Sequence, residues 1–212
     1  MRIFKKHTTA FTRIELVVVM GVCIILFLIL FASLRPARNF SSKLTCTLNL
    51  KQFAIAAKMF DDAHAGYSWD ISTNFGGTEE FGELSELTFR HFQVLSNDIY
   101  YTLGVICPQD SQRQAATNWG VIANTNISYF IGLDSKRNLP TSIIAGDRNI
   151  SPSSVILRTT KSALPNWLSG IGLHGDTGHI AYADGHVEQL NSAGLDLAIQ
   201  STGIATNHFA VP

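Results

Sequence analysis

The longest apolar run of the chain lies near its N-terminus. From Leu16 to Leu34 no residue is charged, and every residue except Ser33 is apolar or glycine. A helix of this length would span about 28 Å, which is close to the hydrocarbon thickness of a bilayer. A cleaved secretory signal fits less well, because its apolar core is shorter and ends at a small-x-small site. The pattern predicts one transmembrane helix over residues 11–34.

A helical pattern continues beyond this run. Four large apolar residues recur at spacings that place them on one face of a helix, and they are Leu44, Leu48, Ile55 and Met59. Phe53, Ala56, Ala57 and Phe60 widen this apolar face, which we expect to pack against a globular domain. Ala65-Gly66 marks the predicted end of the helix. Residues 35–64 are therefore predicted to continue the helix that begins in the membrane.

The remaining residues, 65–212, predict a mixed domain outside the membrane. Apolar runs that end in turn residues predict short strands at 104–108, 129–132, 143–147 and 154–157. Apolar residues at helical spacing predict a short helix between Leu84 and Leu95. We therefore predict an α+β fold in which a long N-terminal helix, half transmembrane and half packed on the domain, precedes a C-terminal antiparallel sheet.

The last strands are predicted to form a hairpin. The runs 179–183 and 186–190 flank Asp184-Gly185, and Asp-Gly is the preferred pair for a two-residue type I′ turn. Such a turn needs positive φ at both central residues, which aspartate and glycine tolerate. We expect His179 and His186, on opposite arms, to lie close enough to meet across the hairpin.

The charge balance argues against a nucleic-acid partner. The chain has 16 basic and 16 acidic side chains, and residues 1–10 hold Arg2, Lys5 and Lys6 but no acid. Without those residues the chain would be slightly acidic. Binding to nucleic acid calls for clustered basic residues on one surface.

One carboxylate, Glu15, stands at the start of the apolar run. A carboxylate costs about 2.5 kcal/mol or more at the centre of a bilayer. A charge in such a place is usually retained because something pairs with it. Glu15 is therefore the first candidate functional residue.

The residues around Glu15 resemble the prepilin signal of type IV pilins and type II secretion pseudopilins. A basic leader ends in Ala10, and Phe11-Thr12-Arg13-Ile14-Glu15-Leu16 follows. The resemblance implies that residues 1–10 are a leader peptide, which a prepilin peptidase removes between Ala10 and Phe11 before the new amine is methylated. It also implies that Glu15 pairs with the amine of a neighbouring pilin-like subunit. Two positions differ from the usual pattern, because Ala10 stands where glycine is common and Arg13 replaces an apolar residue.

The rest of the chain resembles prepilin-like proteins of planctomycete- and verrucomicrobium-type bacteria, which carry a C-terminal His-x9-Asp-Gly element. Here that element is His174 with Asp184 and Gly185. Three further motifs match, and they are Cys46-x-x-Asn49-Leu50-Lys51-Gln52, Cys107-Pro108-x-Asp110 and Gly146-Asp147-Arg148-Asn149. The resemblance implies membrane anchorage, a pilin-like fold and filament assembly. It implies no known reaction.

The histidine-rich C-terminal segment raises the alternative of a metal site. Imidazole and carboxylate groups are dense there, and they belong to His174, Asp176, His179, Asp184 and His186. A calcium-type ion, held mainly by oxygen ligands, is a second alternative. The turn already explains Asp184, and a backbone hydrogen bond would explain His174. We therefore predict no metal and no cofactor.

Enzymatic activity has little support in the sequence. Cys107 and a distant histidine are the elements of a thiol nucleophile. The chain has no Gly-x-Ser-x-Gly elbow and no phosphate-binding glycine loop, and a cysteine before proline is well explained as part of a turn. We predict no catalytic residue.

Cys46 and Cys107 are candidates for a disulfide, because both would lie outside the membrane, where oxidation is permitted. Cys23 lies within the apolar run and should stay reduced. The alternative is two unpaired cysteines in the core, where free cysteine is often buried.

These observations predict a single-pass subunit of the inner membrane whose C-terminal domain is periplasmic or extracellular. Its expected partners are the prepilin peptidase and methylase, other pilin-like subunits and the lipid bilayer. The expected function is assembly into a type IV pilus-like or type II secretion pseudopilus-like filament. An unprocessed, anchored binding module on the cell surface is the alternative.

Overall fold

The computed structural model describes residues 12–82, 84–151, 156–160, 164–170 and 173–212. The chain divides into two compact units between Ser41 and Ser42. A long helix, α1 (Arg13–His64), contributes to both units, and the strands follow it in the second unit. This confirms the predicted α+β fold with a long N-terminal helix and a C-terminal antiparallel sheet.

Helix α1 has a defined start and a defined end. The backbone N–H of Thr12 donates to Glu15 Oε2 at 2.7 Å, and the N–H of Glu15 donates to the Thr12 hydroxyl at 3.3 Å. This reciprocal arrangement is a capping box, which pairs N–H groups that a helix start leaves free. At the other end Ala65 has a φ of +60°, and its N–H donates to the carbonyl of Asp61. The left-handed residue stops the helix.

The first unit contains the membrane-spanning candidate. Residues Arg13–Phe31 form the one helix in the described part of the chain that is long and apolar enough to cross a bilayer, and its side chains are exposed. The helix continues through Pro36.

In the second unit, α1 packs through only part of the apolar surface that we expected to be buried. The buried residues follow spacings of four, three, four and three, and they are Cys46, Leu50, Phe53, Ala57 and Phe60. The prediction is confirmed for the residues that widen the expected face, Phe53, Ala56, Ala57 and Phe60, which are buried. It was wrong for its four main members, which are between 50% and 61% exposed, and they are Leu44, Leu48, Ile55 and Met59. Lys51 and Gln52 interrupt that exposed stripe, whereas the buried stripe is unbroken. The apolar side chains therefore cover two faces of this part of α1.

Six strands of the described chain form one antiparallel sheet in the order β4-β8-β1-β2-β6-β7. Their bounds are β1 (Tyr129–Gly132), β2 (Ile143–Asp147), β4 (Ile156–Thr160), β6 (Thr177–Tyr182), β7 (Val187–Asn191) and β8 (Thr206–Ala210). A separate pair joins β3 (Ile150–Ser151) to β5 (Asn166–Trp167). The strands predicted at 129–132 and 143–147 are confirmed. Part of the strand predicted at 154–157 lies outside the described residues.

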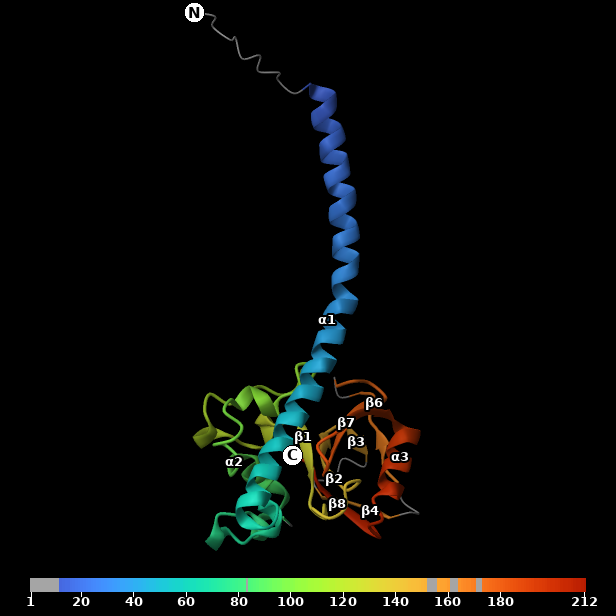
Figure 1. Cartoon of the computed structure of the whole chain (residues 1–212). Helices are drawn as coiled ribbons and strands as arrows, with labels where there is room; N and C mark the ends of the chain where they lie inside the picture. Colours follow the sequence, from blue (N-terminus) through green and yellow to red (C-terminus); the bar gives the residue numbers. More distant parts are fainter. Residues whose placement is uncertain (1–11, 83, 152–155, 161–163, 171–172) are drawn as a thin grey trace, which may run out of the picture. The chain divides into compact units, whose positions relative to one another are not determined.

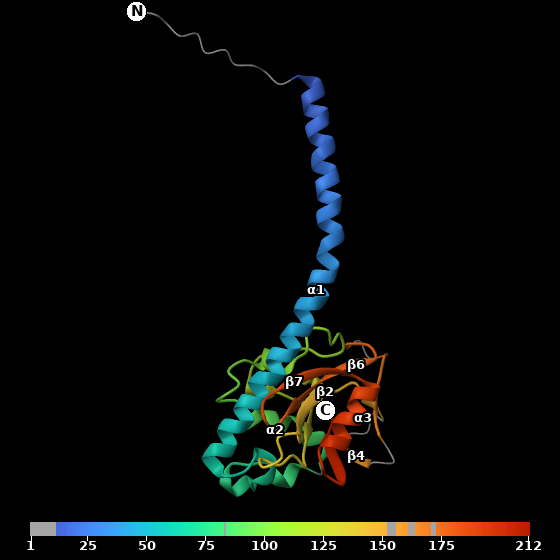
Figure 2. The ribbon, with the colours of Figure 1, turned by 45° about the vertical axis from the view of Figure 1, so that its right-hand side comes forward.

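Both faces of the sheet are covered. Side chains alternate along a strand, so Tyr129 and Ile131 join the core cluster that contains α1, while Phe130 joins the cluster of helix α3 (Ser192–Ser201). In Figure 1 the strands of this unit lie between the second half of α1 and α3. Figure 2 shows α3 against the strands from another side. The result is a three-layer unit.

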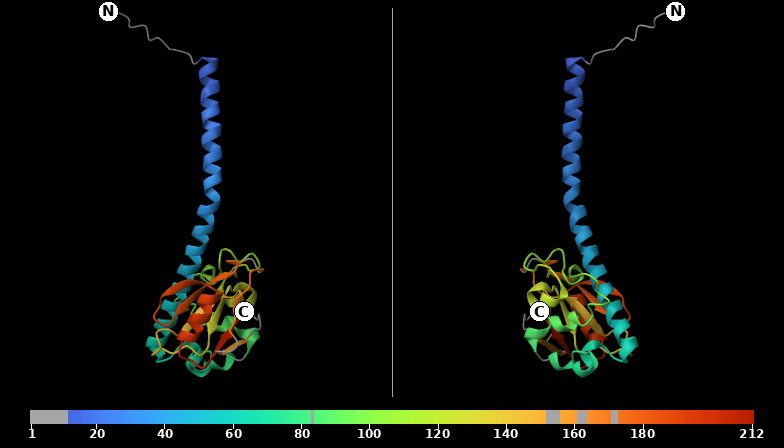
Figure 3. Two further views of the ribbon diagram at one scale, coloured as in Figure 1. Left: turned by 90° about the vertical axis from the view of Figure 1, so that its right-hand side faces the viewer. Right: turned by 90° about the vertical axis from the view of Figure 1, so that its left-hand side faces the viewer.

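Short helical turns pack beside the sheet against the buried face of the second half of α1, and Figure 3 shows them in green. They are η1 (Ser68–Asp70), η2 (Thr73–Phe75), η3 (Glu79–Phe81), η4 (Ser85–Leu87), α2 (Phe89–Gln93), η5 (Thr102–Val105), η6 (Trp119–Val121) and η7 (Asn124–Asn126). The short helix expected between Leu84 and Leu95 is present as η4 and α2. The strand predicted at 104–108 was wrong, because Gly104 and Ile106 bond locally to Tyr101 and Leu103 as in a 3-10 turn.

The C-terminal hairpin is present, but its turn differs from the one predicted. Gly185 has a φ of +88°, whereas Asp184 is not in the positive-φ region. The N–H of Gly185 donates to the Tyr182 carbonyl, and the N–H of Tyr182 donates to the His186 carbonyl. This is a three-residue loop with a left-handed glycine rather than a type I′ turn. His179 pairs with Gln189, three residues after His186, so His179 and His186 do not meet.

Candidate functional site

The first candidate site is the start of α1. Ala10 and Phe11 lie outside the described residues, so the structure describes only Glu15 of the three predicted residues. The Glu15 carboxylate accepts from the Thr12 N–H at 2.7 Å and from the Thr12 hydroxyl at 2.9 Å, both on Oε2. Glu15 therefore has a local role in capping the helix. A role of Glu15 in pairing with another subunit is distinct from this capping role, and the variants described below separate the two.

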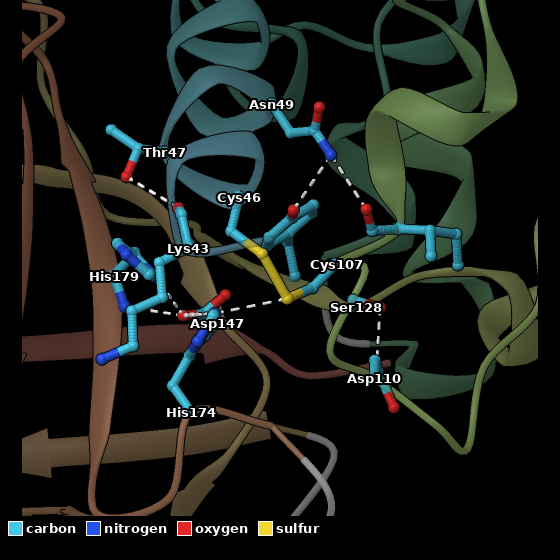
Figure 4. The surroundings of a disulfide bond; sticks show 12 residues. Lys43, Cys46, Thr47, Asn49, Cys107, Asp110, Ser128, Asp147, His174 and His179 are labelled. Carbon is cyan, nitrogen blue, oxygen red and sulfur yellow. Dashed lines mark hydrogen bonds and ion pairs between the residues drawn. A yellow bond between two sulfur atoms is a disulfide. The ribbon is translucent and has the colours of Figure 1, made fainter. Parts of the chain in front are cut away.

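The second candidate site is a buried polar centre made of Cys46, Cys107, Asp147, His174 and His179, which Figure 4 shows around the disulfide. Cys46 lies on α1, and Cys107 lies in the turn after η5. The two form a disulfide with Cα atoms 5.2 Å apart, within the range that such a bond needs. This is the pair that the sequence analysis selected. Cys23 has a free thiol on the exposed apolar helix.

Asp147, at the end of β2, connects the two histidines of the buried centre. Its Oδ2 lies 2.9 Å from His179 Nδ1 and accepts from the His179 backbone N–H at 2.7 Å. The same oxygen lies 3.5 Å from His174 Nε2, and that nitrogen lies 3.2 Å from Cys107 Sγ. The side chains of Asp147 and His174 are fully buried, and that of His179 is 2% exposed. These contacts exist because β2 and β6 are neighbours in the sheet.

The electrostatics of the buried centre are set mainly by burial. Burial lowers the pKa of His174, and the nearby His179 and Lys43 act in the same direction, while the Asp147 carboxylate opposes them. Among the described residues Asp147 Oδ1 and His174 Nδ1 have no hydrogen-bond partner. A buried carboxylate oxygen without a partner is costly. The residues that form the buried centre therefore leave part of its hydrogen-bonding capacity unused.

The residues next to the buried centre hold it in place. Arg148 donates from Nε and Nη2 to the two carboxylate oxygens of Asp110, both at 2.7 Å, and the Ser128 hydroxyl donates to Asp110 Oδ2. Asn49 donates to the Ile106 carbonyl at 2.8 Å, which ties α1 to the turn before Cys107. Asn149 donates to the Thr177 carbonyl at 2.9 Å, which fixes the segment after His174.

The three matched motifs and His174 therefore meet at one place. The Cys-x-x-Asn segment of α1, the Cys-Pro-x-Asp turn and the Gly-Asp-Arg-Asn strand end each contribute to the buried centre or to its support. The positions of these segments do not predict that they meet, because they are far apart in the chain. The matched spacing of the motifs was the only available signal.

The other half of the His-x9-Asp-Gly element lies elsewhere. Asp184 is at the hairpin turn, where it accepts from the His186 backbone N–H and lies 2.6 Å from His186 Nδ1. Partial burial opposes ionisation of Asp184, but the hydrogen bonds from His186 outweigh it and lower its pKa. Asp176 is exposed. Of the five metal candidates, the structure thus brings His174 and His179 together in the buried centre, where it adds Asp147, and it pairs Asp184 with His186 at the exposed turn.

A groove of about 300 Å³ borders the hairpin turn. It is lined by the turn on one side and by the second half of α1 on the other, through Ala54, Ile55, Lys58, Met59, Ala183, Asp184 and Gly185. Two of these residues, Ile55 and Met59, belong to the exposed stripe of α1. The Asp184-Gly185 turn therefore adjoins this exposed surface.

The arrangement does not match a catalytic triad. In a triad the nucleophile and the carboxylate bind opposite nitrogens of the histidine. Here Cys107 Sγ and Asp147 Oδ2 both approach Nε2 of His174, and Cys107 is bonded to Cys46. The chemistry that these residues offer is covalent cross-linking and ligation of a cation.

Comparisons with protein-family models, with curated proteins and with solved structures find no match for this chain.

Proposed function

We propose that the protein is a single-pass, pilin-like membrane subunit that assembles with other pilin-like subunits into a type IV pilus-like or type II secretion pseudopilus-like filament. In this proposal a prepilin peptidase and methylase process it at Ala10–Phe11. Residues 11–34 anchor it in the inner membrane, and the globular unit faces the periplasm or the exterior. The prepilin-like residues from Ala10 to Glu15 support the processing step.

The observation that carries the proposal is the pattern of exposure along α1. In the first unit the apolar side chains of residues 13–31 are exposed, and lipid can cover them. In the second unit Leu44, Leu48, Ile55 and Met59 are exposed although the opposite face of the same helix is packed into the domain. Burying one such side chain is worth about 1.5–3 kcal/mol. An apolar stripe beyond the span therefore favours a second protein partner.

We assign that partner as the α1 helix of a second copy. The stripe presents long aliphatic side chains at helical spacing, which is the surface that suits another apolar helix. The exposed part of α1 in the first unit offers such a helix on every copy. Each copy thus offers the exposed stripe on the second half of α1 and the exposed first half of α1, and contact between the two can repeat from copy to copy.

An anchored binding module is the second candidate, and the groove beside Gly185 is the observation that favours it. Its volume of about 300 Å³ is at the lower limit of ligand pockets. This candidate requires neither processing nor self-association. The two experiments below therefore distinguish it from a filament subunit.

The first experiment measures processing. In cells that make a prepilin peptidase, intact-mass analysis of the membrane-extracted protein should show a chain that begins at Phe11, is lighter by residues 1–10 and carries an N-methyl group. The matched control is the same gene expressed in cells without the peptidase, where the full mass is expected. Retention of residues 1–10 in the presence of the peptidase would contradict the proposal and favour the anchored module.

The second experiment separates the two roles of Glu15. Glu15→Gln removes the charge but retains a residue that a capping box accepts, whereas Glu15→Ala removes both. Both variants should insert in the membrane, and both should lower the yield of filaments or crosslinked oligomers at least about tenfold. A charge-assisted hydrogen bond is worth about 1.5–3 kcal/mol, and 1.4 kcal/mol corresponds to a factor of ten.

Thr12→Ala is the matched control for Glu15, because it removes the capping hydroxyl and keeps the carboxylate. Its oligomer yield should stay close to that of the wild type. If Thr12→Ala abolishes assembly while Glu15→Gln assembles normally, Glu15 acts only as a helix cap and the pairing role is wrong.

A further inference from the structure

We propose that Asp147, His174 and His179 form a site for one zinc ion. All three side chains lie in the buried centre, and one ligand atom from each lies within 4.8 Å of the others. The residues come from the end of β2, from the segment before β6 and from β6 itself. This proposal does not depend on filament assembly.

The distances between the groups suit a tetrahedral ion. Nitrogen and oxygen ligands lie about 2.0–2.2 Å from zinc, so two ligands of a tetrahedral ion lie about 3.3 Å apart. Here the Asp147 carboxylate is 2.9 Å from His179 Nδ1 and 3.5 Å from His174 Nε2. The ligand atoms of His174 and His179 lie within 4.8 Å of each other, so binding of a tetrahedral ion would bring these two nitrogens to about 3.3 Å.

The charge of the buried centre also favours a cation. Asp147 is a fully buried carboxylate, and its Oδ1 has no hydrogen-bond partner among the described residues. Its closest partners in the structure are two imidazoles and a backbone N–H, none of which carries a permanent positive charge. A buried carboxylate is normally paired with a cation or bound to a metal. A divalent ion would supply the missing charge.

The ligand set selects zinc over calcium. Calcium takes six to eight oxygen ligands, whereas two imidazoles and one carboxylate are typical of zinc and related transition metals. The two histidines are candidate ligands in the sequence, whereas Asp147 is not near them in the chain. Asp147 lies 32 residues before His179 and reaches it only through the pairing of β2 with β6.

The neighbouring residues restrict the movement of the proposed ligands. The Thr177 hydroxyl donates to the His174 carbonyl at 2.9 Å, and Asn149 donates to the Thr177 carbonyl at 2.9 Å. The Cys46–Cys107 disulfide forms one wall beside His174 Nε2. These hydrogen bonds fix the backbone of the segment that carries His174, whereas the Nδ1 atom of its ring has no hydrogen-bond partner among the described residues.

Zinc binding to the full chain in detergent, with the disulfide intact, tests the proposal. Protein stripped with a chelator is incubated with Zn²⁺ until binding is constant, desalted and analysed for metal, and its affinity is measured against a chromophoric chelator. We expect one zinc per chain. Because loss of a supporting residue costs 10–100-fold in metal affinity, loss of a ligand in His174→Gln, His179→Gln or Asp147→Asn should cost about 100-fold or more.

His208→Gln is the matched control, since His208 also pairs with an aspartate, Asp134, but lies outside the buried centre. Its zinc affinity should equal that of the wild type. A Co²⁺ spectrum of the wild type needs no variant that might misfold, and it should show tetrahedral bands without a thiolate charge-transfer band. The proposal is overturned if no zinc binds, if His174→Gln binds as well as the wild type, or if binding requires reduction of the disulfide. The last result would place the ion on Cys46, Cys107 and His174, the second cluster of possible ligands.

Discussion

Replacing both Cys46 and Cys107 with alanine should lower the free energy of unfolding of the globular unit by about 4 kcal/mol. The disulfide closes a loop with a sequence separation of 61, and the loss of chain entropy in the unfolded state for such a loop gives this magnitude. Both cysteines are fully buried, so alanine is preferred to serine, which would bury a hydroxyl. Chemical denaturation of the full chain in detergent measures the difference. Since whole domains have about 5–15 kcal/mol of stability, this is a large share.

Cys23→Ala is the control for the disulfide, because Cys23 is free and lies on the exposed apolar helix. It should leave the unfolding transition of the globular unit unchanged. Thiol counting on the denatured, unreduced wild type should find one free cysteine. Three free thiols, together with an unchanged transition in the double variant, would contradict the cross-link.

Asp110→Asn should lower the free energy of unfolding by about 3–5 kcal/mol. Asp110 and Arg148 form a bidentate ion pair in which the Asp110 side chain is fully buried and that of Arg148 is 9% exposed. Removing the carboxylate charge leaves the guanidinium buried without a counter-charge, and breaking such a pair from one side typically costs this much. Denaturation followed by circular dichroism measures the loss.

Asp98→Asn provides the matched control for Asp110, because Asp98 is an exposed aspartate of the same unit. A surface change of this kind should stay within about 0.5 kcal/mol of the wild type. The double variant Asp110→Leu with Arg148→Met should recover much of the loss, since it removes both charges together. A loss below about 1 kcal/mol in Asp110→Asn would show that the pair does not stabilise the fold.

Local patterns were sufficient to predict several elements of the fold. The uncharged run to Leu34 predicted the apolar helix, and the apolar runs at Tyr129 and Ile143 predicted β1 and β2. These elements depend on hydrophobicity and turn residues within a few positions, which the sequence displays directly. The end of α1 was also predicted, although Ala65 rather than Gly66 takes the left-handed conformation.

The choice of helix face and the type of turn could not be predicted by the same reasoning. Two apolar stripes compete on the second half of α1, and only the tertiary structure decides which of them is buried. The unbroken spacing of Cys46, Leu50 and Phe53 was the available signal. In the hairpin, the three-residue loop follows from the register of β6 with β7, in which Ala181 pairs with Val187. The Asp-Gly pair alone does not fix that register.

The buried centre was predicted only in part. Compartment and position suggested Cys46 and Cys107 as a pair, but the proximity of His174 to Cys107 depends on how the segment before β6 is placed. Asp147 joins the histidines because β2 lies beside β6 in the sheet, and strand order is a long-range property. Each of the three sequence motifs could therefore be recognised in the sequence, but their proximity in the folded domain could not be predicted.

The disulfide also defines a path for mechanical load. Cys46 is the fifth residue of the globular unit, so tension applied through the preceding helix reaches a covalent bond almost at once. From Cys107 the force passes through two intervening residues to Asp110 and then across its ion pair to Arg148, beside β2. The cross-link also prevents the segment between the two cysteines from extending under tension. With a sequence separation of 61 and 3.3–3.6 Å per residue, that segment would be about 200 Å long if fully extended. A pull on the N-terminal helix is therefore carried to the sheet, and it cannot peel the rest of α1 away from the domain.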